Sequence, residues 1–83
     1  MDEVSLQVFF LDGTNKRVKI QAADIVAFED KFDLPVDEIR LNKHLYFLAY
    51  TSLFRQKETA KDFSDWLLDL EKAEFNDPKG LSV

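Results

Sequence analysis

The only imidazole in the chain belongs to His44, which makes this residue the first candidate for a catalytic base. A histidine base works together with a nucleophile, or with an acidic group that orients its ring. The residues around His44 are Asn42 and Lys43, with Arg40 about one turn earlier, and none of these side chains fills either role. We therefore interpret His44 as a histidine on a helix surface and predict no catalytic role for it.

A second candidate is the acidic stretch 30–38, which could be taken for a calcium loop. Such a loop alternates oxygen ligands and needs a glycine at its sharp turn. Here Leu34-Pro35-Val36 stands where the glycine should be, so we interpret the carboxylates as helix caps and solvated charge. The four acidic residues are Asp30, Asp33, Asp37 and Glu38.

Three further carboxylates, those of Asp62, Asp65 and Asp69, would form a stripe along one helix. A stripe of this kind could mimic a nucleic-acid backbone or hold a metal ion. More often it is the solvated face of an amphipathic helix, and Phe63 and Trp66 supply the opposing apolar face. We favour this interpretation and expect no metal site.

Residues and motifs that are absent from the sequence exclude further kinds of catalytic and binding site. Cysteine is absent, which excludes disulfides, thiolate nucleophiles and cysteine-bound zinc. Gly13 and Gly80 are the only glycines, so no glycine-rich phosphate loop can form. No serine stands in the context of a nucleophile elbow. We predict a protein that is not an enzyme, carries no cofactor and acts by binding another protein.

The composition is that of one small acidic domain. The chain has 83 residues, of which 46% are hydrophobic, and a net charge of −5. An acidic protein is poorly suited to bind nucleic acid, and the short basic segment 16–19 is too small to change this. No apolar run is long enough to cross a membrane, and the acidic start does not resemble a signal peptide.

Hydrophobic alternation predicts an N-terminal β-hairpin. Residues 4–10 and 16–20 alternate, and the turn signal Asp12-Gly13-Thr14-Asn15 lies between them. An odd loop, with Gly13 in the left-handed conformation, places Val18 and Ile20 on the same face as Leu6. A two-residue loop would invert these faces, so we predict the odd loop.

Three helices are predicted to follow, over residues 22–32, about 37–57 and about 61–75. The middle one is apolar almost all round, so we expect it to be largely buried, in part against a partner. The predicted fold is therefore α+β, with an N-terminal β-hairpin followed by three helices (ββααα) and a central helix that is largely buried. Residues 1–75 form the single domain, and residues 76–83 form a flexible tail.

The chain has more large apolar side chains than one small core needs. Phe9 and Leu11 lie on the hairpin face opposite the predicted core, where they could form a binding surface, contact a further strand or be covered by the first helix. The central helix carries aromatic residues on its outer side as well. The residues that we predict to contact a partner are Phe9, Leu11, Tyr46, Tyr50 and Phe54.

Four segments carry a resemblance to a known family. They read VFFLDG with VKI between residues 8 and 20, DIVAFE at 24–29, LYFLAYTSLFR at 45–55 and FSDWL at 63–67. The residue types in these segments, and the order of the segments, resemble those of the short tail assembly chaperones of long-tailed bacteriophages, especially phages of Gram-positive bacteria. The resemblance covers about residues 6 to 75.

The resemblance implies a function. Such chaperones are thought to coat the helical tape-measure protein in the bacterial cytoplasm and to keep it soluble until tail-tube subunits polymerise around it. The implied partners are the tape-measure protein and, as a second candidate, the tail-tube protein, and self-association stays open. The alternative is a small acidic inhibitor that binds a host enzyme by mimicking nucleic acid.

Overall fold

The fold combines a small sheet with three α-helices. A computed structural model of the chain describes residues 4–76 and confirms the predicted α+β class, with a hairpin first and helices after it. The elements, in order, are β1 (Val4–Phe10), β2 (Asn15–Ile20), α1 (Ala22–Phe32), the 3-10 helix η1 (Val36–Glu38), α2 (Asn42–Arg55), α3 (Phe63–Asp69) and β3 (Leu70–Phe75).

The hairpin has the predicted register. Leu6 of β1 lies opposite Val18 of β2, and both side chains are buried. The backbone N–H of Phe10 donates to the carbonyl of Thr14 at 2.9 Å and closes a three-residue loop. Within that loop Gly13 has φ 93°, a conformation that glycine adopts without steric cost. The prediction of an odd loop with a left-handed glycine is confirmed.

The third helix is shorter than predicted, because α3 ends at Asp69 and the chain continues as β3. The expectation of helix to about residue 75 is wrong. β3 runs antiparallel to β1, with Val8 opposite Ala73 and Gln7 opposite Glu74. The physical reason is that β1 has backbone donors and acceptors on both edges, and β2 satisfies only one of them. The third strand satisfies the other.

The predicted tail begins too early by one residue. The backbone N–H of Asn76 donates to the carbonyl of Ser5 at 2.9 Å, so Asn76 extends the pairing of β3 with β1. The remainder of that prediction, residues 77–83, lies outside the residues that the structure describes.

The central helix also begins later than predicted, at Asn42 instead of Asp37. Pro35 and Ile39 have extended backbones on either side of η1, which interrupts the helix. The extended segment lets Val36 and Ile39 pack against the core. With 14 residues α2 remains the longest helix, and no helix within residues 4–76 is long and apolar enough to cross a membrane.

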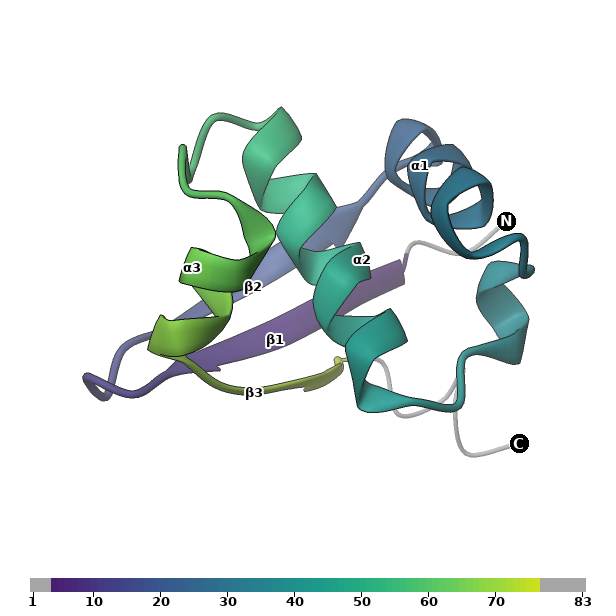
Figure 1. Ribbon diagram of the computed structural model, residues 1–83. Coiled ribbons are helices and arrows are strands. Elements are labelled where there is room, and N and C mark those ends of the chain that lie inside the picture. Colours follow the sequence, from purple (N-terminus) through teal and green to yellow (C-terminus); the bar gives the residue numbers. More distant parts are fainter. Residues whose placement is uncertain (1–3, 77–83) are drawn as a thin grey trace.

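The molecule has two layers. The strand order is β2-β1-β3, and all three α-helices lie on one face of this sheet, with α2 between α1 and α3 (Figure 1). The core lies between the layers, where α2 contributes Leu48, Ala49 and Leu53. α2 is thus largely buried, as predicted, although only this side of it is fully covered within the chain. The outer side of α2 is where the candidate site lies.

Candidate functional site

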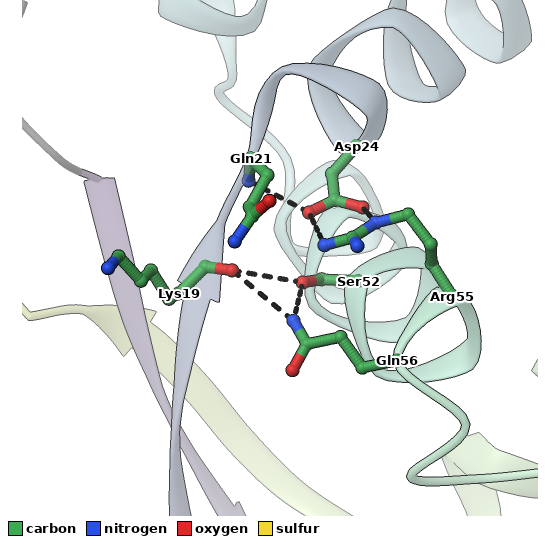
Figure 2. Close-up of polar contacts among 6 residues, drawn as sticks. All are labelled: Lys19, Gln21, Asp24, Ser52, Arg55 and Gln56. Carbon is green, nitrogen blue, oxygen red and sulfur yellow. Dashed lines mark hydrogen bonds and ion pairs between the residues drawn. The ribbon is translucent and has the colours of Figure 1, made fainter.

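The most extensive buried polar contacts join α1 to α2 (Figure 2). The guanidinium of Arg55 donates two hydrogen bonds to the carboxylate of Asp24, at 2.6 and 3.0 Å. The backbone N–H of Gln21 donates to the same carboxylate at 2.8 Å. The Asp24 side chain is 1% exposed, so the ion pair is closed to a ligand on the carboxylate side.

The electrostatics of Asp24 agree with a structural role. Burial raises the pKa of this carboxyl, but the hydrogen bonds from Arg55 and Gln21, together with the positive charge of Arg55, outweigh burial and leave the pKa below its usual value. Asp24 is thus a carboxylate held in its charged form, which does not suit a general acid.

The same contacts fix α2 to the sheet. The hydroxyl of Ser52 donates to the backbone carbonyl of Lys19 in β2 at 3.2 Å, and Gln56 donates to the Ser52 hydroxyl oxygen at 2.9 Å (Figure 2). This arrangement sets the rotation of α2, because it holds the Ser52 side against β2. The opposite side of α2 therefore faces away from the sheet.

In the structure, His44 and Asp62 make contacts with neighbouring residues of the same chain. The His44 ring makes edge contacts with Phe28 and Phe32, with centroid distances of 5.8 and 4.7 Å. Asp62 caps α3 by accepting from the backbone N–H of Asp65 at 2.9 Å. Within residues 4–76, no three histidine, cysteine or acidic side chains are placed to hold a metal ion.

The acidic stripe of α3 is also partly neutralised. Asp69 forms an ion pair with Lys61, in the loop that precedes α3. With Asp62 engaged as a cap, two of the three stripe carboxylates have partners within the molecule.

Aromatic rings gather on the outer side of the helical layer. Phe47, Tyr50 and Phe54 stand at helical spacing on α2, and Phe32 of α1 and Phe63 of α3 flank them. Their ring centroids form an unbroken series, with 5.4 Å from Phe32 to Phe47, 5.4 Å from Phe47 to Phe63, 5.3 Å from Phe63 to Tyr50 and 5.7 Å from Tyr50 to Phe54. We refer to these five residues as the aromatic face.

The rings of the aromatic face are partly exposed to solvent, and Tyr50 is held in place by contacts with the rest of the fold. Phe54 is 50% exposed, and the other four side chains are half-buried. The Tyr50 hydroxyl donates to the carbonyl of Lys61 at 2.7 Å, and the Tyr50 ring packs on buried Trp66 at 5.5 Å. Burial, together with the carboxylate of Asp62, raises the pKa of Tyr50, so the hydroxyl keeps its proton. A partner would thus meet a preformed apolar surface.

The structure brings together only two of the five residues predicted to contact a partner. Tyr50 and Phe54 are in ring contact, whereas Tyr46 is half-buried against the core. Phe9 is half-buried on the outer face of the sheet, which the α-helices do not cover, and the ammonium of Lys72 lies 5.0 Å from its ring centroid. The first helix does not cover Phe9.

Leu11 occupies a different place from the aromatic face. It is 67% exposed in the hairpin loop and lines a groove of about 610 Å³ between that loop and the segment from α2 to α3. Trp66 and Leu53 also line this groove. Ion pairs bridge its lining, with Lys16 and Glu58 2.9 Å apart. The groove is therefore partly filled by charges that already have partners.

Sequence reasoning missed three members of the aromatic face. Phe63 fits the apolar face of its predicted helix, Phe47 falls in the apolar middle of the central one, and Phe32 stands at the end of the predicted helix 22–32, so none of them stands out as a surface residue. The spacing of residues 47, 50 and 54 was the available signal, because i, i+3 and i+7 share one side of a helix. The contacts with α1 and α3 require the tertiary structure.

Comparisons of the chain with protein-family models, with curated proteins and with solved structures give no match.

Proposed function

We propose that this chain is a non-enzymatic chaperone that binds apolar helical segments of a phage tape-measure protein and keeps them soluble during tail assembly. The observation that carries the proposal is the aromatic face, with its partly accessible rings on the outer side of α1, α2 and α3. The resemblance to tail assembly chaperones supplies the identity of the partner. The tail-tube protein is a second partner within the same proposal.

The rings of the aromatic face suit an apolar partner. Aromatic side chains expose large, rigid apolar area, and they lose little conformational entropy on binding. An amphipathic helix presents its own apolar stripe at i, i+3 and i+7, and such a stripe fits a surface between packed helices. The aromatic face extends from α1 across α2 to α3, so it has the length for such a contact.

Charge supports the same proposal. The chain has a net charge of −5, so each bound copy adds negative charge to an otherwise apolar partner. Covering apolar stripes and adding like charge both oppose aggregation. Release during assembly requires each contact to be modest, with total affinity arising from several copies along one long partner.

The proposal is tested by co-expression with a phage tape-measure protein. Phe54→Ser removes the most exposed ring of the aromatic face without opening the core. The matched control is Leu68→Ser, because Leu68 is 73% exposed on α3 and belongs to no ring contact of the aromatic face. We expect the soluble fraction of the partner to fall with Phe54→Ser and to stay at the wild-type level with Leu68→Ser.

The placement of Phe9 and Leu11 provides a second comparison. Phe9→Ser changes the outer sheet face and Leu11→Ser changes the groove, so neither alters the aromatic face. If either of them abolishes the solubility of the partner while Phe54→Ser has no effect, the binding surface is not the aromatic face. If no variant and no wild-type chain keeps the partner soluble, the chaperone function itself is wrong.

A further inference from the structure

The outer edge of β3 presents backbone groups that pair with no other residue within 4–76. In β1 the Phe10 N–H bonds toward β2, whereas the Ser5 carbonyl accepts from Asn76 on the β3 side. Odd-numbered residues of β1 therefore bond to β3, and their partners Lys72 and Glu74 point their backbone groups inward. The alternating residues Ala73 and Phe75 point their N–H and C=O groups away from β1, toward the open edge.

No other described strand pairs with this edge. The strand order β2-β1-β3 places β3 at one side of the sheet, and the α-helices lie on one face of the sheet (Figure 1). The backbone hydrogen bonds at the two ends of β3, from Leu11 to Asp69 and from Asn76 to Ser5, both run to the β1 side. An exposed strand edge of this kind is a template for pairing with another strand.

We propose that this edge pairs with the same edge of a second copy, antiparallel, so that two three-stranded sheets join into one. The two-fold axis passes beside Ala73, whose backbone groups bond to those of Ala73 in the partner. Phe75 then lies opposite Glu71 of the other copy, and Lys72 lies opposite Glu74. This inference is independent of the proposed chaperone function.

Charge complementarity selects the second copy as the occupant. Lys72 and Glu74 are both more than half exposed, with side-chain exposures of 53% and 56%, and their charged groups are 3.8 Å apart within one chain. In the proposed dimer, each lysine faces the glutamate of the other copy at non-hydrogen-bonded positions, where side chains approach most closely. The strand is thus complementary to itself.

The neighbouring registers are disfavoured by the same charges. Sliding one copy by two residues in one direction puts Lys72 opposite Lys72, and sliding in the other direction puts Glu74 opposite Glu74. Like charges directly opposite each other destabilise a strand pair. A slip by a single residue would place the outward backbone groups of one copy opposite residues whose groups point toward β1, so only the Ala73-centred register combines hydrogen bonding with opposite charges.

Sedimentation equilibrium on the full chain tests the proposal. We expect the wild-type protein to form a concentration-dependent dimer. With Lys72→Glu, glutamates stand at both position 72 and position 74, and with Glu74→Lys, lysines stand at both. Like charges then face each other across the dimer, so each variant alone should raise the dimer dissociation constant about tenfold. An equimolar mixture of the two variants should restore dimerisation, because each glutamate then meets a lysine.

The matched controls make the same charge changes elsewhere. Lys57→Glu and Glu29→Lys alter exposed residues outside β3, and they should dimerise like the wild type, alone or mixed. The proposal is overturned if the wild type stays monomeric at every concentration. It is equally overturned if the β3 variants dimerise as tightly as the controls, or if their mixture fails to restore the dimer.

Discussion

Asp24 is the one charged side chain that is fully buried within residues 4–76. Its carboxylate accepts two hydrogen bonds from the guanidinium of Arg55, which lies 31 positions further along the chain in α2. Because Arg55 keeps 35% of its side chain exposed, part of its charge remains hydrated while Asp24 is desolvated. The ion pair therefore positions α1 against α2, and its contribution to stability depends on the charge of Asp24.

We expect Asp24→Asn to lower the free energy of unfolding at neutral pH by roughly 1–3 kcal/mol, because Arg55 loses its charged acceptor. The pKa of Asp24 is lower in the folded protein than in the unfolded chain. Its stabilisation is therefore complete above the unfolded value, near pH ~4, and is lost as the pH falls through the folded value. Urea unfolding of both proteins across this pH range measures the effect.

The difference between wild type and Asp24→Asn should accordingly shrink as the solution becomes acidic. Asp30→Asn, an exposed change on α1, serves as the control and should leave both the stability and its pH dependence nearly unchanged. A difference for Asp24→Asn that stays constant through the acidic range would contradict the assigned role of the ion pair.

The two largest core side chains allow a second residue-scale test. Phe28 is 0% exposed and Trp66 is 3% exposed. Replacing either with alanine should lower the free energy of unfolding by about 3–5 kcal/mol, as aromatic-to-alanine changes in cores do. Leu68→Ala, which changes an exposed apolar residue of α3, should stay within about 0.5 kcal/mol of wild type. A wild-type melting temperature for either core variant would show that the core is assigned wrongly.

At the scale of elements, β3 turns a hairpin into a sheet. A two-stranded hairpin is marginal in water, and a third strand together with packed helices gives it independent stability. β3 follows α3 directly, with Leu70 as the first strand residue. An irregularity in the pairing, where β1 passes from Phe9 to Phe10, lets Leu70, Ala73 and Phe75 all face the helical side.

Amide hydrogen exchange tests this arrangement. The amides of Lys72 and Glu74 bond to β1 and should be protected, whereas those of Ala73 and Phe75 should exchange faster in dilute protein. Raising the protein concentration should slow exchange at Ala73 and Phe75 only, since the proposed dimer occupies those groups. Equal protection of all four amides in dilute solution would show that the strand is oriented otherwise.

The hairpin and β3 show which parts of the sheet can be predicted from the sequence. The hairpin, its glycine loop and the faces of Leu6 and Val18 were predicted, because alternation and turn residues are local signals. β3 was not predicted, because a short segment that follows an amphipathic helix can equally be interpreted as a continuation of that helix. Only the unfilled edge of β1, a non-local requirement, selects the strand.

The candidate site was predictable in part for the same reason. Tyr50 and Phe54 share a side of one helix, so their spacing reveals them. Phe32 and Phe63 join them only through contacts between helices, at 5.4 Å to Phe47 in both cases. The ion pair between Asp24 and Arg55 has no local signature at all, because its partners are separated by most of two helices.

On the scale of the whole molecule, the sheet and the helical layer divide the surface into two unlike parts. The outer sheet face is mostly polar, with Gln7 donating to Asn15 at 2.8 Å and accepting from Asn76 at 3.2 Å across three strands. The outer helical surface carries the aromatic face. A dimer joined through β3 would leave both aromatic faces free, and two linked faces bind a long repetitive partner more tightly than one.

The measurement that tests the central claim most directly is a chemical-shift map of the isotope-labelled chain, titrated with an amphipathic helical segment of the tape-measure protein. We expect the largest shifts to cluster at Phe47, Tyr50, Phe54 and Phe63, with little change at Phe9 or in the hairpin loop. Shifts concentrated on the outer sheet face or in the groove beside Leu11, with the aromatic face unaffected, would contradict that claim.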